Sequence, residues 1–302
     1  MDWMERVRNL RQWSQNGVRA PHKPLLLLYA LGRFQQDADA ALRFTSVEGD
    51  LARLLEDFGP NRKTSAAYPF HHLTSDGVWE VRTDTGSGSP GSGVGKLRSS
   101  GAAGRLAPGL RAALSSEPAL LGRLAHLLLD SHFPPSLHPD ITAAVGLDLE
   151  AADGTASAVL LGGVAKETRR RNAELRAKVL MAYEYRCAFC GFSGSIGHSP
   201  VGLEAAHVRW WAFDGPDRLS NGLCLCSLHH KLFDQGVLGL SEQRRIVVSQ
   251  EFIGDGPAAR RQVHDLSGQP LMGPQPGTDP VAPEHIAWHT RQVFRGEPRL
   301  AA

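Results

Sequence analysis

All four cysteines of this 302-residue chain lie between Cys187 and Cys226. Cys187 and Cys190 form a C-x-x-C pair, whose spacing lets two thiolates of one tight turn face the same ion. Gly191 supplies the permissive backbone of that turn. So few cysteines, so close together in a chain of this size, indicate a local metal site and not a disulfide framework.

The other two ligands are expected in the stretch LCLCSLHHKLFDQG, residues 223–236. Cys226 and His229 repeat the two-residue gap as C-x-x-H, and they complete a Cys₃His set for a structural Zn²⁺. Cys224 is the alternative to Cys226, because both side chains share a face if the segment is extended. Its distance from His229 breaks the matched spacing, so we expect Cys224 to pack as a small buried hydrophobe. His230 follows His229 directly, and adjacent side chains of a helix diverge by about 100°. We therefore expect His230 to face a second, catalytic metal.

The composition as a whole excludes few classes of protein. Hydrophobic residues make up 42% of the chain and charged residues 21%. No apolar run approaches the roughly 20 residues that span a bilayer, and the N-terminal residues MDWMERVRNLRQW alternate charged and apolar side chains, unlike a signal peptide. We therefore expect a cytoplasmic protein without a membrane partner. The net charge of +2 permits a nucleic-acid partner without arguing for one.

The periodicity of the first half predicts a mixture of helices and strands. Helices are expected over residues 2–15 and 21–34, a strand leading into a helix over 42–59, and a strand over 78–82. The chain is therefore assigned to the α+β class. We divide it into a first domain (1–135), a small, proline-punctuated linker (136–165) and a second domain (166–302).

Residues 84–104 are rich in glycine and serine and are expected to form a loop. Within them, GVGK resembles the end of the phosphate-binding motif G-x-x-x-x-G-K-[ST]. Pro90 and Leu97 occupy two of the fixed positions of that motif, so we do not assign nucleotide binding.

Between the two ligand pairs, His207 ends the block LEAAH, and Asn221 opens the block NGLCLCSLHH. These blocks and LFDQG, spread over residues 187–236, resemble the HNH (ββα-metal) nucleases. The resemblance implies a phosphodiester hydrolase in which His207 is the general base and Asn221 braces the loop and the base. It also implies that His230 is a ligand of a catalytic Mg²⁺ or Mn²⁺, and the chemistry needs such a cation to neutralise charge on the phosphate.

One position departs from this family pattern. Many relatives carry aspartate directly before the first histidine as a second metal ligand, and Ala206 stands there in this chain. Glu204 is the candidate replacement, directly or through water. On a strand Glu204 and His207 would point to opposite faces. Asp234 has two open interpretations, a cap at the end of the helix or a role at the metal.

Two short motifs of the first domain place basic residues beside aromatic ones, as nucleic-acid surfaces do. They are RAPHKP (19–24), at a helix start, and NRKTSAAYPFHHL (61–73), in which Arg62 and Lys63 precede an aromatic-proline-aromatic group. Either stretch alone is more often a helix cap or a packed loop. The motifs they contribute are APHKPLLLLY (20–29) and YPFHHL (68–73). With the HNH blocks, they resemble the sulfur-binding-domain/HNH restriction endonucleases, the McrA-like enzymes that recognise phosphorothioate-modified DNA. The resemblance implies an apolar cavity for the backbone sulfur, walled by Tyr68 and Pro69. His72 stands at the third cavity position, where family members often carry a small residue.

Sulfur is larger, more polarizable and more weakly hydrated than the phosphate oxygen it replaces, so a proline ring and an aromatic edge favour it. The resemblance further implies that Arg19, His22, Lys23 and Arg98 contact neighbouring phosphates or base edges.

The leading hypothesis is a type IV-like restriction endonuclease that cuts double-stranded DNA near a phosphorothioate mark, as a homodimer that reaches both strands. A second hypothesis keeps the nuclease but has it read a methylated base or an unmodified sequence. A third is a non-catalytic, zinc-stabilised DNA-binding protein.

Overall fold

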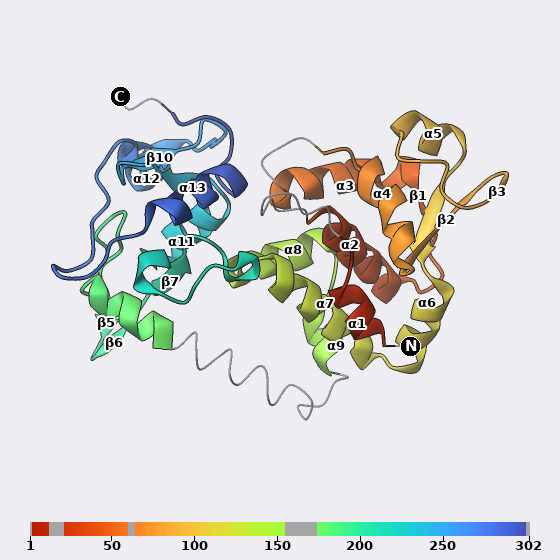
Figure 1. The fold of residues 1–302 in the computed structure, drawn as a ribbon, viewed down its shortest axis with the longest axis horizontal. Helices are drawn as coiled ribbons and strands as arrows, with labels where there is room; N and C mark the ends of the chain where they lie inside the picture. Colours follow the sequence, from red (N-terminus) through yellow and green to blue (C-terminus); the bar gives the residue numbers. More distant parts are fainter. Residues whose placement is uncertain (1, 12–20, 60–63, 155–173, 300–302) are drawn as a thin grey trace. The chain divides into compact units, whose positions relative to one another are not determined.

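The computed structural model describes residues 2–11, 21–59, 64–154 and 174–299 (Figure 1). The chain divides into two compact units, Met1–Leu160 and Leu161–Ala302. Each unit contains helices and strands, so the predicted α+β class is confirmed. Within the described ranges, every helix is too short or too polar to cross a bilayer.

The first unit carries nine labelled helices among its described residues. The first of them ends at Arg8, with Asn9 as its C-cap, so it is shorter than the helix expected over residues 2–15. The helices are α1 (Trp3–Arg8), α2 (His22–Gln36), α3 (Phe44–Phe58), α4 (Ala67–His72), α5 (Val94–Ser99), α6 (Pro108–Ser116), α7 (Ala119–His132), α8 (His138–Val145) and α9 (Leu149–Gly154). Short 3-10 helices are η1 (Leu73–Asp76) and η2 (Pro135–Leu137). The strands are β1 (Leu42–Arg43), β2 (Trp79–Thr83), β3 (Gly86–Ser87) and β4 (Ala103–Leu106).

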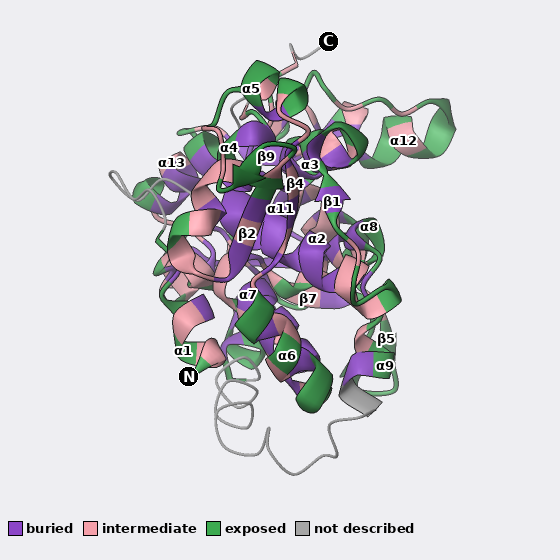
Figure 2. Cartoon of the chain, turned by 90° about the vertical axis from the view of Figure 1, so that its right-hand side faces the viewer, coloured by how far each residue is buried: buried purple, intermediate pink, exposed green. Residues whose placement is uncertain are grey.

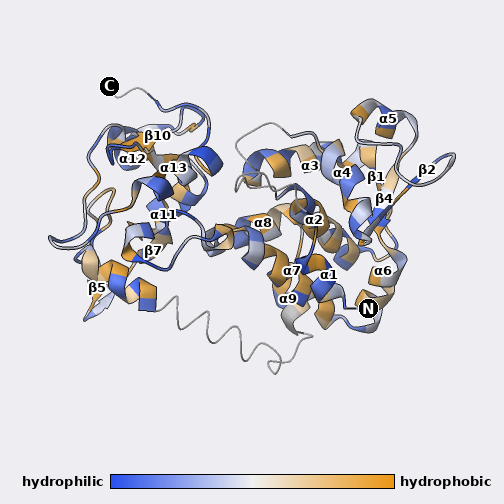
Figure 3. Cartoon of the chain, viewed as in Figure 1, coloured by the Kyte–Doolittle hydropathy of each residue, from blue (hydrophilic) through white to orange (hydrophobic). Residues whose placement is uncertain are grey.

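Helix α2 forms the centre of the first unit. Every residue from His22 to Gly32 is buried (Figure 2). The helix packs against α3, α4, α7 and α8, and both α2 and α7 contain many hydrophobic residues (Figure 3). A helix that is apolar on all sides needs this complete cover, which explains the unbroken run of four leucines.

A four-stranded antiparallel sheet of order β1-β4-β2-β3 stands beside these helices. Gly104 on β4 makes room for the indole of Trp79, since a Cβ there would lie 2.0 Å from the Trp79 Cζ2 atom. The Trp79 indole N–H donates to the backbone oxygen of Phe70 at 3.0 Å, and the two rings meet edge to face. The sheet thereby fixes α4, the helix that carries Tyr68 and Pro69.

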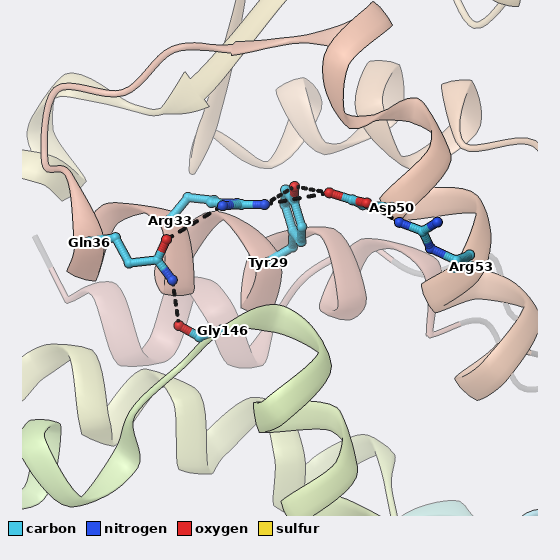
Figure 4. Close-up of polar contacts among 6 residues, drawn as sticks. All are labelled: Tyr29, Arg33, Gln36, Asp50, Arg53 and Gly146. Atoms are coloured by element: carbon cyan, nitrogen blue, oxygen red, sulfur yellow. Dashed lines mark hydrogen bonds and ion pairs between the residues drawn. The ribbon is translucent and has the colours of Figure 1, made fainter.

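A polar network ties α2 to its neighbours (Figure 4). The Tyr29 hydroxyl donates to Oδ2 of Asp50 on α3 at 2.9 Å, and the Arg33 guanidinium donates to the Tyr29 oxygen at 2.9 Å. Burial, opposed by Arg33, raises the pKa of Tyr29, so this hydroxyl keeps its proton. Gln36 Nε2 donates to the backbone oxygen of Gly146 at 3.0 Å, directly after α8.

Residues 136–154, which the sequence analysis assigned to a linker, form η2, α8 and α9 on the first unit. α8 packs against α2, and α9 packs against α7. Leu137, Ile141 and Val145 are buried in these contacts. The first unit therefore extends past residue 135, because these apolar side chains complete the cover of α2 and α7.

The glycine- and serine-rich segment 84–104 is also more ordered than the expected loop. It contains β3, α5 and the start of β4. Leu97 of α5 is fully buried, and this contact anchors the short helix despite its weak helical composition.

The second unit begins, in its described part, with a helix over residues 174–182. Its strands are β5 (Ser195–Ile196), β6 (Ser199–Pro200), β7 (Leu203–His207), β8 (Gly222–Cys226), β9 (Leu238–Leu240) and β10 (Ile246–Val248). Its labelled helices are α11 (Ser227–Asp234), α12 (Gly256–Gln262) and α13 (Pro283–Gln292), with 3-10 helices η3 (Trp211–Phe213), η4 (Leu219–Asn221) and η5 (His264–Leu266).

Strands β7 and β8 pair antiparallel, with Leu203 opposite Cys226 and His207 opposite Gly222. Helix α11 starts directly after Cys226 and packs against both strands, which gives a ββα unit. Helix α13 packs against α11, where the His289 ring stacks on the Phe233 ring with a centroid distance of 3.8 Å.

Candidate functional site

Cys187, Cys190, Cys226 and His229 form one cluster, in which the four donor atoms lie within 4.8 Å of one another. The C-x-x-C turn is closed by the amide of Gly191, which donates to the Cys187 oxygen at 2.8 Å, and Gly191 has a φ of +73°. Three sulfurs and one imidazole nitrogen are the donor set of a tetrahedral structural metal site. The cluster can therefore hold a metal ion.

The orientation of His229 suits this role. Its Nδ1 lies 3.5 Å from the Cys187 sulfur and 3.2 Å from the Cys226 sulfur. Its Nε2 lies 2.7 Å from the backbone oxygen of Gln262. A metal-binding histidine commonly donates its second ring N–H to such a carbonyl, which leaves Nδ1 for the ion.

Cys224 lies outside the cluster. It is fully buried on β8, opposite Ala205, and burial followed by the charge of Cys187 raises the pKa of its thiol to about 12. A thiol that keeps its proton is a poor ligand. The structure thus gives Cys224 the packing position expected from its spacing.

His230 contacts a different group of side chains from its neighbour His229. Its Nδ1 lies 2.6 Å from Oε2 of Glu204, and its Nε2 lies 3.1 Å from Oδ2 of Asp234. Ser227 Oγ donates to Oε1 of Glu204 at 2.6 Å. The two adjacent histidines therefore belong to two clusters, as their divergence on a helix predicted.

His230 lies between the carboxylates of Glu204 and Asp234, which shift its pKa. Burial by itself lowers the pKa of His230, but the carboxylates of Asp234 and Glu204 outweigh burial and raise the pKa to about 10. The hydrogen bond from His230 lowers the pKa of Glu204 to about 2, against the opposing effect of burial. An imidazole nitrogen beside a half-exposed carboxylate fits a hard divalent cation that takes its remaining oxygens from water and phosphate.

His207, at the end of β7, pairs with a residue that the sequence analysis did not consider. Its Nε2 lies 2.8 Å from Oδ1 of Asp217. Asn221 is fully buried and holds the intervening loop: its side chain accepts from the Arg209 amide at 2.8 Å and donates to the backbone oxygens of Arg209 and Pro216. Asn221 thus holds the loop between β7 and β8 through backbone contacts to Arg209 and Pro216.

In the first unit, three rings from the two N-terminal motifs come together. The Tyr68 and His72 ring centroids lie 4.3 Å apart, and His22 meets Tyr68 edge to face at 5.9 Å. Pro69 is buried, whereas Tyr68 is 36% exposed. Burial, with the charges of His71 and Lys23, lowers the pKa of His72.

Two family models match the chain. One, described as the ScoMcrA-like, DNA sulfur-binding domain, matches residues 1–150. The other, described as HNH endonuclease, matches residues 187–241. The chain is a ScoMcrA-like DNA sulfur-binding domain joined to an HNH endonuclease domain. The first match ends within α9, and the second covers the ββα unit, the Cys₃His cluster and the group around His230.

Solved structures are also similar to parts of the chain. The sulfur-binding domain of ScoMcrA complexed with phosphorothioated DNA is 22% identical, with a TM-score of 0.42, over 50% of this chain and 98% of that domain. The type IV phosphorothioation-dependent restriction endonuclease ScoMcrA is 22% identical, with a TM-score of 0.38, over 49% of this chain and 28% of that protein. The modification-dependent TagI restriction endonuclease is 25% identical, with a TM-score of 0.29, over 39% of this chain and 36% of that chain. No curated protein matches the sequence.

Three of the basic residues expected at the DNA are buried or paired with other side chains of the same domain. In the sulfur-binding domain, Lys23 is buried in an ion pair with Asp76 at 2.5 Å. Arg98 on α5 makes two hydrogen bonds to Glu48, at 2.8 and 3.0 Å. His22 is buried, with Nε2 3.0 Å from Oγ1 of Thr64. Arg19 lies outside the described residues.

The contacts of two carboxylates in the HNH domain with His207 and His230 were not predicted from the sequence. Asp217 contacts His207 across a ten-residue loop. Asp234 lies one turn after His230 on α11, and this i, i+4 spacing was the available signal. The helix cap at that end is Gln235.

Proposed function

We propose that the protein is a type IV-like restriction endonuclease that recognises phosphorothioate-modified double-stranded DNA and hydrolyses phosphodiester bonds nearby. The observation that carries the proposal is the presence, on one chain, of a DNA sulfur-binding domain and an HNH endonuclease domain. Contacts to phosphates carry no sequence information, so the first domain would decide where the second one cuts.

The sulfur would be recognised by the aromatic group around Tyr68. With its lowered pKa, His72 is an uncharged ring near neutral pH, so Tyr68 and His72 offer an apolar and polarizable surface. Pro69 is buried beside them, and a contact with the sulfur would require it to become accessible. A phosphate oxygen that contacts this surface loses hydration without a hydrogen bond in return, whereas a sulfur, which is more weakly hydrated, loses less free energy. Because Lys23 and Arg98 are ion-paired, phosphate contacts by these side chains would require exchange of their partners, which lowers their contribution.

Hydrolysis would begin at His207. The Asp217 carboxylate accepts only, so the Nε2 facing it carries the proton, and Nδ1 has the lone pair that removes a proton from the attacking water. Asn221 keeps the following loop in place. Mg²⁺ or Mn²⁺, held by His230 and Glu204, would supply neutralisation of charge on the phosphate.

The Cys₃His cluster would hold a structural Zn²⁺. Each chain carries one HNH domain, and a single site cuts one strand at a time. We therefore propose a homodimer for double-strand cleavage, acting in the cytoplasm.

The test compares duplexes of one sequence, with and without a phosphorothioate linkage, incubated with the full-length protein and Mg²⁺ or Mn²⁺. Cleavage of the modified duplex alone is expected. Binding of the two duplexes is then compared with the full-length His207→Ala variant, whose binding domain is unchanged. Equal affinity for both would refute phosphorothioate recognition, and absence of cleavage by the wild type in either cation would favour a non-catalytic binder.

A further inference from the structure

The carboxylate of Asp234 is almost fully buried and touches His230, a proposed catalytic residue. Its side chain is 1% exposed. Oδ2 contacts Nε2 of His230 at 3.1 Å, and Oδ1 accepts from the Trp210 indole N–H at 3.1 Å. Burial of a carboxylate costs folding free energy unless specific partners offset its lost hydration. The burial of Asp234 therefore indicates a role in the domain.

We infer that Asp234 is a positioning residue that holds His230 through Nε2 and thereby presents Nδ1, beside Glu204, to the catalytic cation. The inference rests on the proposed function in one respect, that His230 and Glu204 hold this cation. It assigns Asp234 neither to capping nor to direct ligation.

The two carboxylates contact different nitrogens of one ring. Asp234 lies at Nε2, and Glu204 lies at Nδ1. A carboxylate only accepts hydrogen bonds, so Nε2 must remain protonated against Asp234. Nδ1 is then the nitrogen that can release its proton to solvent and bind a cation through its lone pair, and Glu204 is the oxygen donor next to it. Histidine ligands of metals typically donate their other N–H to such a carboxylate.

The support behind Asp234 is rigid. Trp210 is 1% exposed, and its ring packs against Phe213 and Trp288 of α13 at centroid distances of 6.4 and 5.9 Å. Its N–H fixes Oδ1 of Asp234, which directs Oδ2 to His230. A buried chain of contacts thus runs from α13 to the exposed edge of the candidate cation site.

Asp234→Asn is the informative substitution because the Trp210 indole N–H can donate only to the oxygen of the new amide, which fixes the orientation of that amide. The indole N–H needs the amide oxygen as its acceptor, which turns the amide NH₂ toward Nε2 of His230. Nε2 must then accept, and Nδ1 must carry the proton. The nitrogen beside Glu204 would be blocked while the volume of the side chain is unchanged.

The experiment measures Mn²⁺ binding calorimetrically to the full-length, zinc-loaded protein without DNA. Asp234→Asn is expected to weaken binding by about 10- to 100-fold, the usual effect of losing such a partner. Asp214→Asn, at a carboxylate that is 99% exposed, is the matched control and should bind as the wild type does. Zinc content and thermal midpoint report whether each variant is folded.

The outcomes separate this inference from the proposed function. If Glu204→Gln loses Mn²⁺ binding and Asp234→Asn keeps it, the role of Asp234 is wrong and the cation site stands. If both variants bind Mn²⁺ as the wild type does, the cation site itself is wrong. The cleavage activity of Asp234→Asn should recover as the Mn²⁺ concentration is raised. A loss of activity that persists at saturating Mn²⁺ would overturn the positioning role.

A measurement on the wild type covers the case in which Asp234→Asn does not fold. Nitrogen-15 NMR of the His230 ring with Mg²⁺ should find Nε2 protonated and Nδ1 deprotonated. The opposite pattern would overturn the inference.

Discussion

The cysteine pair on β8 offers a matched test of the metal cluster. Cys226 contributes its sulfur to the cluster, whereas Cys224, two residues earlier, is buried without joining it. Cys226→Ala and Cys224→Ala delete the same atom from the same strand. We therefore expect Cys226→Ala to lose the metal and the folding of the second domain, and Cys224→Ala to keep both.

The losses of stability expected for Cys226→Ala and Cys224→Ala differ enough to be measured. A structural zinc site contributes about 10–16 kcal/mol, which matches or exceeds the roughly 5–15 kcal/mol by which a native domain is stable. Cys226→Ala should therefore lack the cooperative thermal transition of the second unit. Deleting the buried Cys224 sulfur costs about 1 kcal/mol, or roughly 3 °C.

The assay is zinc content by atomic spectroscopy, combined with calorimetric unfolding of the full chain. The wild type and Cys224→Ala should each retain one zinc ion per chain, and Cys226→Ala should not. A folded Cys226→Ala protein that keeps its zinc, or a Cys224→Ala protein that loses it, would refute the ligand assignment.

Three further outcomes are expected. His207→Ala should reduce cleavage by about 100-fold or more, the usual effect of losing a general base, at unchanged zinc content; cleavage at the wild-type rate would exclude His207 as the base. The pKa of His230 is raised from 6.5 to about 10, so its stabilising effect is complete below about pH 6.5 and is lost as pH rises toward 10. Urea unfolding of the wild type and His230→Gln, without added Mg²⁺ or Mn²⁺, should therefore converge near pH 10, and a constant difference would contradict the ion pairing. Tyr68→Ala should weaken binding of phosphorothioate DNA more than binding of plain DNA, and an equal loss on both would argue against its place in the sulfur site.

Local spacing was enough to predict the metal cluster and the division of the two histidines. Ligand gaps of two residues and the divergence of neighbours on a helix are properties of a few residues. They do not depend on the rest of the fold, so Cys226, His229 and His230 occupy the positions that their sequence indicates.

Partners distant in sequence could not be predicted in this way. Lys23 meets Asp76 across 53 positions, and Arg98 meets Glu48 across 50, so their charges were assigned to DNA when the sequence was considered alone. The pairing of Asp217 with His207 depends on the path of the loop that Asn221 holds. The boundary at residue 135 was set too early for a similar reason, since only the packed fold reveals that α2 and α7 need cover from α8 and α9.

The adjacency of His229 and His230 on α11 has a consequence for when the enzyme becomes active. One short helix orients both side chains, so any turn of α11 that releases His229 from the cysteines also carries His230 away from Glu204. A newly made chain that has not yet acquired its structural ion would therefore lack an assembled cutting centre. Activation of the nuclease would therefore follow loading of the structural ion, and oxidation of the cysteines would prevent it.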